Sequence, residues 1–223
     1  MKHSMIVIAA ALLSGPVFAQ EVTTSLATSR PANNALELTL GFGYAQGFGD
    51  IGSSARSLTD LSSAGGELSL GVGYRINPEF MIGVYGSGAK YATGDFTNGA
   101  DIWTATAGVQ ANYHFLPAAD FDPWVGLGTG WRGHWISHGG TDSRHGWDIG
   151  KLTLGVDYRV SSEFAVAPYL GVGVTTFLTQ ELASQQRFQN ISSPTANVWL
   201  FGGIQGRFDL FGSGGPSVKL ASN

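Results

Sequence analysis

Large apolar residues occupy every second position through most of this chain, with small or polar residues between them. In residues 36–44 the even positions hold Leu, Leu, Leu, Phe and Tyr, whereas the odd positions hold Glu, Thr and Gly. Alternation of this period is typical of a β-strand that has one apolar and one polar face. The pattern occurs in eight segments, which are residues 36–44, 67–76, 80–91, 103–115, 125–135, 151–160, 164–178 and 197–210. It predicts an all-β fold of eight antiparallel strands.

An internal repeat and the connections between the segments indicate how the strands are joined. Residues 66–80 and 150–164 are identical at nine of fifteen positions, which suggests a repeated hairpin unit. Short turns near 77–79, 116–122 and 161–163 alternate with long polar loops near 47–65, 92–100, 138–148 and 180–195. A repeated hairpin with alternating short and long connections is typical of an up-and-down transmembrane β-barrel.

The direction of the apolar face distinguishes a membrane barrel from a secreted soluble barrel of the lipocalin type. A soluble barrel has its large apolar residues inside and its charges outside, and a membrane barrel has the reverse arrangement. Charged residues make up only 13% of the chain, and Gly, Ser and Thr dominate the polar face, which suits a narrow lumen better than a solvated surface. We therefore predict that the apolar face meets lipid. Its aromatic residues form a predicted girdle at the two membrane boundaries, namely Tyr44, Tyr74, Tyr113, Phe115, Trp131, Trp135, Tyr158 and Phe208.

The first residues have the features of a secretory signal peptide. Lys2 precedes an apolar run at residues 5–13, a Gly-Pro break follows, and Ala19 precedes the expected cleavage site. The apolar run is too short for a membrane anchor, which needs about 18 or more apolar residues. We expect a signal peptide at 1–19, a polar lead at 20–35, the barrel at 36–211 and a tail at 212–223.

The chain resembles the small outer-membrane β-barrel proteins of Gram-negative bacteria, the group that includes the OmpA membrane domain and OmpX. The resemblance covers residues 36–211 and rests on PWVGLGTGW at 123–131, LGVDYRV at 154–160, PYLGVGV at 168–174 and the closing strand at 199–211. It implies a place in the bacterial outer membrane, contact with outer-membrane lipid and lipopolysaccharide, and insertion by the barrel-assembly machinery. Such chains often end in an aromatic residue that this machinery reads. Here Phe211 is out of phase with Phe208, so the signal is expected to be internal.

The predicted lumen is narrow and contains charges of both signs. Eight strands enclose an interior just wide enough for side chains, which excludes a wide pore. With the N-terminus in the periplasm, the inward charges form two layers. The periplasmic layer is Glu37, Arg75, His114, Asp157, Arg159, Arg207 and Asp209, and the outer layer is Glu67, Arg132, His134 and Lys151. Since unpaired charges in such a lumen are costly, we expect them to pair and to close it. This favours a structural or surface-interaction role, with a narrow channel for small or hydrophobic solutes as the alternative.

Composition and spacing argue against several other functions. The net charge of −4 argues against a nucleic-acid partner, and the absence of Cys excludes a disulfide scaffold and a thiolate metal site. A lipid A-modifying enzyme would need a Ser/His pair on one face, but His134 and Ser137 are three residues apart on a strand and so face opposite sides. We therefore predict no catalytic residue and no cofactor.

The third outer loop carries several groups that could bind a metal. They are His134, His138, His145, Asp142 and Asp148, but their spacing in a Gly-rich loop is not a specific metal signature. We interpret these histidines as solvated loop residues and predict no metal. The long loops are polar and exposed, so an extracellular ligand could bind there.

Overall fold

The computed structural model describes residues 33–51, 57–97, 99–161, 163–185 and 187–212. The predicted signal peptide, most of the polar lead and nearly all of the tail lie outside these residues. The described residues form nine strands and one short helix. They are β1 (Ala35–Phe48), α1 (Leu58–Leu61), β2 (Ser62–Arg75), β3 (Phe80–Thr93), β4 (Asp101–His114), β5 (Phe121–Ser137), β6 (Thr141–Arg159), β7 (Phe164–Glu181), β8 (Phe188–Asn190) and β9 (Ala196–Leu210). Among the described residues, no helix has the length and apolar character needed to cross a membrane.

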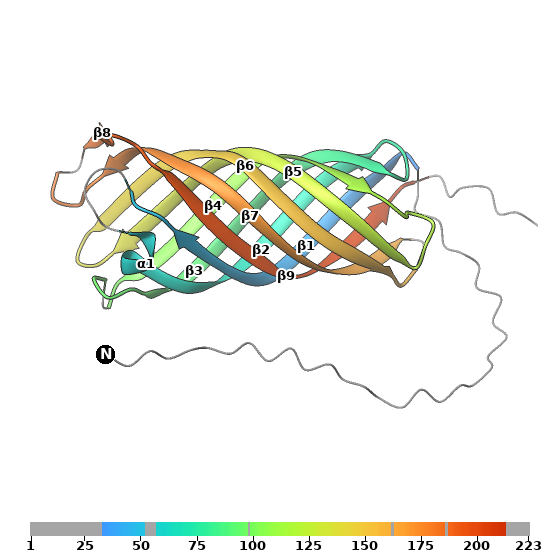
Figure 1. The fold of residues 1–223 in the computed structure, drawn as a ribbon, viewed down its shortest axis with the longest axis horizontal. Helices are drawn as coiled ribbons and strands as arrows, with labels where there is room; N and C mark the ends of the chain where they lie inside the picture. The colour runs from blue at the N-terminus through green and yellow to red at the C-terminus, as the bar shows by residue number, and fades with distance from the viewer. Residues whose placement is uncertain (1–32, 52–56, 98, 162, 186, 213–223) are drawn as a thin grey trace, which may run out of the picture.

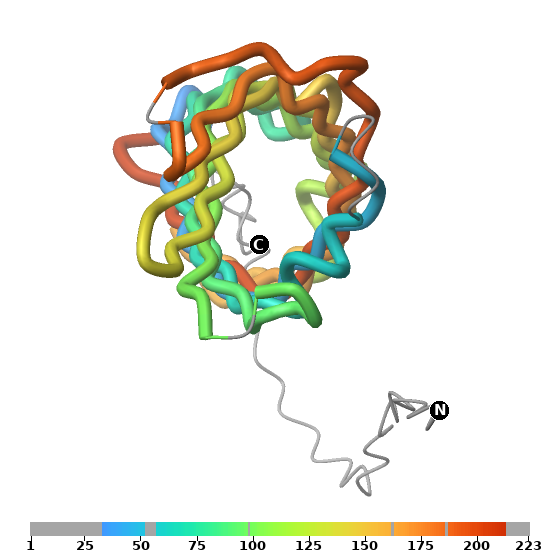
Figure 2. The backbone as a smooth tube through the Cα atoms, turned by 90° about the vertical axis from the view of Figure 1, so that its left-hand side faces the viewer, coloured from blue at the N-terminus to red at the C-terminus, as the bar shows by residue number. Residues whose placement is uncertain are grey.

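Eight of the strands form a closed antiparallel barrel, which confirms the predicted fold. The strands from β1 to β7 pair in sequence order, each with its neighbour. Strand β9 pairs with both β7 and β1, and this closes the ring. The three-residue strand β8 adds to the far end of β7. Figure 1 shows the strands steeply tilted, and Figure 2 shows them as a ring viewed along the barrel axis.

The two ends of the barrel differ. At one end, here called the turn end, β2–β3, β4–β5 and β6–β7 are joined by short connections, and β1 begins beside the end of β9. At the other, called the loop end, lie α1 and β8, on the left of Figure 1.

Side chains on the barrel alternate as predicted, with large apolar groups outside and polar groups inside. Phe42, Leu68 and Leu127 are each more than 60% exposed on the outer surface. By contrast, the largest fully buried side chains include Arg75 and Arg207. The chain has no further element that covers this apolar belt among its described residues, so the fold suits lipid as its surroundings.

The third connection at the loop end is not the long loop that the sequence predicts. Strand β5 continues to Ser137 and β6 begins at Thr141, so only residues 138–140 connect them. Gly139 in this connection has a φ of 67°. The prediction was wrong because residues 141–148 mix polar and apolar side chains. A strand that extends beyond the hydrocarbon layer has no need of an apolar face, so its alternation weakens.

Glycine allows close approach between neighbouring strands at defined positions. Gly43 on β1 is paired with Gly203 on β9, and a Cβ on Gly43 would lie 2.1 Å from the Gly202 carbonyl oxygen. Gly108 and Gly130 form an equivalent pair between β4 and β5. A side chain at these positions would force the strands apart, so the glycines permit the sharp curvature of a narrow barrel.

Candidate functional site

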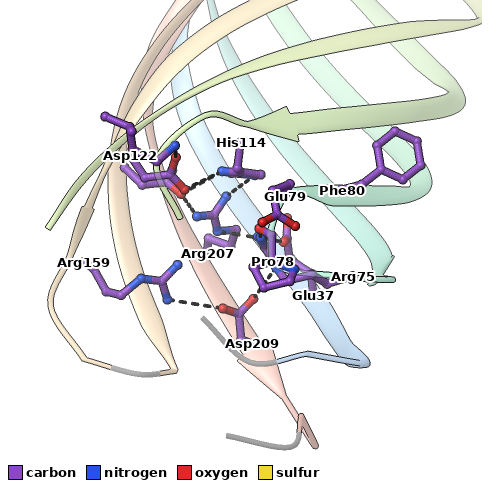
Figure 3. A network of polar contacts seen from close by, with 12 residues as sticks. Glu37, Arg75, Pro78, Glu79, Phe80, His114, Asp122, Arg159, Arg207 and Asp209 are labelled. Carbon is purple, nitrogen blue, oxygen red and sulfur yellow. Dashed lines mark hydrogen bonds and ion pairs between the residues drawn. The ribbon is translucent and has the colours of Figure 1, made fainter. Parts of the chain in front are cut away.

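A network of charged side chains fills the lumen at the turn end (Figure 3). The Arg75 guanidinium forms an ion pair with Glu37, donates to the Pro78 carbonyl oxygen at 2.8 Å and lies 3.6 Å from the Asp209 carboxylate. Asp209 in turn lies 3.4 Å from Nη1 of Arg159. All four charged groups are buried. Each charge is therefore stabilised by its partners rather than by bulk water.

Arg207 on β9 connects this half of the network to the other. Its guanidinium forms an ion pair with Asp157, lies 3.9 Å from the Glu37 carboxylate and donates from Nη1 to His114 Nε2 at 2.9 Å. Because arginine can only donate, His114 must accept at Nε2 and carry its proton on Nδ1. That proton is donated to Asp122 Oδ2 at 2.8 Å. In its neutral form, the His114 ring thus accepts one hydrogen bond from Arg207 and donates another to Asp122.

One group within this network has the composition of a metal site. The nitrogen of His114 and the carboxylates of Asp122 and Asp157 lie within 4.8 Å of one another. In the arrangement described, however, His114 Nδ1 carries a proton and Nε2 accepts from Arg207, so the ring offers no lone pair to a metal. The positively charged Arg207 guanidinium already forms an ion pair with the Asp157 carboxylate. The donors therefore do not fit a metal ion.

The structure brings together all seven residues that the sequence assigns to the periplasmic layer. It adds Asp122, so four carboxylates face three guanidinium groups across the barrel. Asp122 was not predicted from the sequence because residues 116–122 were assigned to a turn, whereas β5 begins at Phe121. Asp122 also accepts from the Leu116 backbone N–H at 3.0 Å, which holds the turn against the network. These groups come from six strands, and their side chains meet in the lumen at the turn end.

A second ion pair lies deeper in the lumen towards the loop end. Arg132 on β5 donates to both carboxylate oxygens of Asp148, at 2.9 and 3.1 Å, and Thr175 donates to the same carboxylate. The guanidinium also lies over the Trp199 ring, with its carbon 4.4 Å from the ring centroid. Asp148 was assigned to a loop from the sequence. A bulge between Asp148 and Gly150 reverses the alternation of β6 at this point, and this turns the carboxylate inwards.

Glu67 and Lys151, which the sequence assigns to the outer layer, lie in the lumen between the network at the turn end and the Arg132–Asp148 pair. Lys151 places its ammonium 4.0 Å from the Tyr85 ring centroid and 5.0 Å from that of Phe201. Both charged residues line a small chamber of about 40 Å³, together with amide and hydroxyl side chains such as Gln110. A space of this size has room for roughly three or four water molecules, at ~10–15 Å³ each.

An apolar cluster fills the loop end of the lumen, where the sequence analysis expected polar side chains. Its members are Ala45, Ile51, Leu58, Leu61, Ala89, Tyr91, Ile102, Ile136, Phe177, Ile191, Trp199 and Phe201. Leu58 and Leu61 come from α1, whose Ser57 accepts from the Thr59 backbone N–H as part of a capping box with Asp60. This Ser-x-x-Asp spacing is the sequence signal that could have revealed α1.

The histidines near the loop end are not the solvated loop group that the sequence suggests. His134 is fully buried in the lumen, with its ring 6.2 Å from Phe177 and 6.3 Å from Trp199. His145 lies on the outward side and stacks on Trp131 at 5.6 Å. Only His138 of the three is exposed. The interpretation failed for His145 because β6 extends through residues that were assigned to a loop. His134 lies on β5, and its burial agrees with its alternative assignment to the outer layer of the lumen.

Among the described residues, no hydrogen bond joins the Ser137 hydroxyl to the ring of His134. The Ser137 hydroxyl hydrogen bonds with that of Thr141 at 3.1 Å. Neither ring nitrogen of His134 has a hydrogen-bond partner among the described residues. The geometry therefore lacks the contact through which a base activates a serine.

The eight residues of the predicted aromatic girdle lie on the outward side of the strands. Most are exposed, and Trp135 is partly covered by the ring of Trp103, with which it stacks at 3.9 Å. The predicted girdle omits two further outward tryptophans near the loop end, Trp103 and Trp147, which are 43% and 51% exposed. Trp103 was assigned to the apolar face of its strand from the sequence, whereas Trp147 was assigned to a loop. Phe208 is outward and Phe211, just past β9, is 92% exposed.

Comparison with known proteins identifies the fold. The family model of the outer membrane protein β-barrel domain matches residues 5–202. Neisserial surface protein A is similar in structure, with 16% identity, a TM-score of 0.53, and coverage of 78% of this chain and 97% of that one. OprG, an outer membrane protein from Pseudomonas aeruginosa, is similar with 13% identity, a TM-score of 0.54, and coverage of 81% and 98%. Among curated proteins, no sequence matches significantly.

Proposed function

This chain belongs to the outer membrane protein β-barrel family and resides in the bacterial outer membrane, and from that premise we propose that it is a closed barrel with a structural or surface-interaction role. The observation that carries the proposal is the double closure of the lumen. The charged network crosses the turn end, while the Arg132–Asp148 pair and the apolar cluster fill the loop end. A solute would have to displace both, and each contains buried charges or tightly packed side chains.

Conductance measurements test this proposal directly. In planar bilayers at neutral pH we expect no stable single-channel steps from the wild-type barrel. We expect the same from the double variant Arg132→Ala/Asp148→Ala, because the network at the turn end remains intact. Insertion is checked by heat-dependent migration in gel electrophoresis of the reconstituted protein. Stable, reproducible steps from the wild-type protein would contradict the proposal and favour a channel.

A narrow channel for small or hydrophobic solutes is the second candidate. The small chamber beside Glu67 and Lys151 favours it, because the chamber is bordered by groups that can hold water or a small polar solute. Passage would still require movement of the Trp199 ring and of the network at the turn end. Selective uptake into proteoliposomes, without added denaturant, would support this candidate over the closed barrel.

We propose no catalytic role for the Ser137 region. Incubation of the reconstituted barrel with purified lipid A, followed by mass spectrometry, is expected to leave every acyl chain in place. A protein-dependent loss or transfer of an acyl chain that disappears in Ser137→Ala would overturn this expectation. Ser137→Ala is a mild change, because its hydroxyl bonds only to the exposed Thr141 hydroxyl among the described residues.

The partners we propose follow from the surface of the barrel. The apolar belt would meet outer-membrane lipid, and the loop end would face lipopolysaccharide and any extracellular ligand. Insertion by the barrel-assembly machinery would use the β9 segment, in which Phe208 faces outwards.

A further inference from the structure

Aromatic rings form a continuous cluster on the outward side of the barrel near the loop end. Trp135 is at its centre, stacked on Trp103 at 3.9 Å and in edge contact with Trp131 at 6.0 Å. His145 stacks on Trp131 at 5.6 Å, and Phe188 of β8 lies 5.7 Å from His145. These five residues, which we call the outer aromatic cluster, join β4, β5, β6 and β8 into one surface.

The distribution of tryptophan around the barrel is one-sided. Of the six tryptophans, Trp124 and Trp199 are buried, and the other four face outwards on β4, β5 and β6. Strand β1, which lies across the barrel from β5, contains no tryptophan. A girdle that only positions a barrel in its membrane has no need of such asymmetry. The cluster therefore suggests a particular contact on one side.

The position of the cluster along the membrane normal indicates which layer of the membrane it contacts. On β4, Tyr113 and Trp103 are 10 positions apart, and on β6, Tyr158 and Trp147 are 11 apart. A transmembrane strand needs about 9–11 residues to cross the hydrocarbon layer. Trp103 and Trp147 thus mark the outer boundary, and His145 lies two residues beyond it.

Phe188 lies further out still, because β8 pairs with the last three residues of β7, Thr179–Glu181. The outer aromatic cluster therefore rises from the hydrocarbon edge into the headgroup layer. In the outer leaflet of this membrane, that layer consists of the phosphorylated sugars of the glycolipid lipopolysaccharide.

The chemistry of the cluster suits such a headgroup. The C–H faces of sugar rings pack well on aromatic rings, and tryptophan offers the largest ring surface together with a polar N–H. Two exposed cations flank the cluster: Lys90, which is paired with Trp103 in the sheet and shares an ion pair with Asp101 at 2.7 Å, and Arg187, which precedes Phe188. Cations at both ends can contact phosphate groups.

The Trp131 and Trp135 rings pack in the space that Gly133, which has no side chain, leaves between them. A Cβ on Gly133 would lie 2.1 Å from the Trp135 ring and 2.7 Å from that of Trp131. Both rings therefore close over this glycine. We propose that the outer aromatic cluster is a binding site for the phosphorylated sugar headgroup of one outer-leaflet glycolipid molecule. The proposal rests on the loop end facing outwards, but not on whether the lumen conducts.

Native mass spectrometry of the detergent-solubilised barrel tests this site. The probe is lipopolysaccharide that lacks the outer core and O-antigen, titrated against the wild type, Trp135→Leu and Gly133→Ala. We expect one glycolipid per wild-type barrel and about five-fold or greater weakening in both variants. Gly133→Ala keeps every ring but displaces two of them, so it separates ring geometry from ring removal. Phosphatidylglycerol, an anionic lipid without sugar rings, is expected to compete poorly.

Tyr44→Leu on β1 is the matched control, because it removes an exposed outward aromatic near the same end. It is expected to bind the glycolipid as the wild type does, and all variants are first shown to fold by heat-dependent gel migration. Equal weakening by Tyr44→Leu, equal binding of phosphatidylglycerol, or unchanged binding in both cluster variants would overturn the proposal. So would a dimer that only the cluster variants lose, since the surface would then join two copies of the chain.

Discussion

Replacing Arg207 by Ala is expected to lower the free energy of unfolding by about 3–5 kcal/mol, because it leaves buried carboxylates without their partner. Arg207 contacts Asp157, Glu37 and His114 at once. Without it, four buried carboxylates face only the guanidinium groups of Arg75 and Arg159. The measurement is urea unfolding of the barrel in lipid vesicles, followed by tryptophan fluorescence.

Two further variants make this result specific. Arg187→Ala removes an exposed arginine outside the lumen and is expected to change the unfolding free energy by no more than about 0.5 kcal/mol. The double variant Arg207→Met/Asp157→Asn removes both charges of one pair, so it should be more stable than Arg207→Ala by at least about 1 kcal/mol. An Arg207→Ala barrel as stable as the wild type would show that the network does not hold the lumen together.

The second large effect is expected from a single methyl group at Gly43. Its Cβ would lie 2.1 Å from the Gly202 carbonyl oxygen and 2.8 Å from the Gly203 Cα. Both are backbone atoms, so no side chain can rotate away, and β1 and β9 must separate. We expect Gly43→Ala to destabilise the barrel by about 2–3 kcal/mol in the same urea assay.

Gly66 provides the matched control for this substitution. It also lies in a strand, but a Cβ there would have no heavy atom within 4 Å. Gly66→Ala is therefore expected to stay within about 0.5 kcal/mol of the wild type. If the two alanine variants were equally stable, close approach of β1 and β9 would not be the reason for glycine at position 43.

The candidate site could be predicted in part because alternation already assigns each strand residue to a face. Glu37 and Arg75 were placed in the lumen from the sequence, and the structure brings them into contact. Asp148 could not be placed in this way. The bulge beside Gly150 shifts the alternation by one residue, and bulges leave little trace in a single sequence.

The strands, the direction of their faces and the membrane environment could all be predicted from the sequence alone. These properties depend on residues close together in the chain, whose spacing of two is fixed by strand geometry. Which charges pair and which side chains fill the loop end depend instead on how the strands assemble. Arg207 and His114 are 93 positions apart, and their contact depends on the register of strands that meet only when the barrel closes. Likewise, the leucines of α1 pack into an apolar cluster with residues from several strands. The local sequence pattern does not predict such contacts between distant segments.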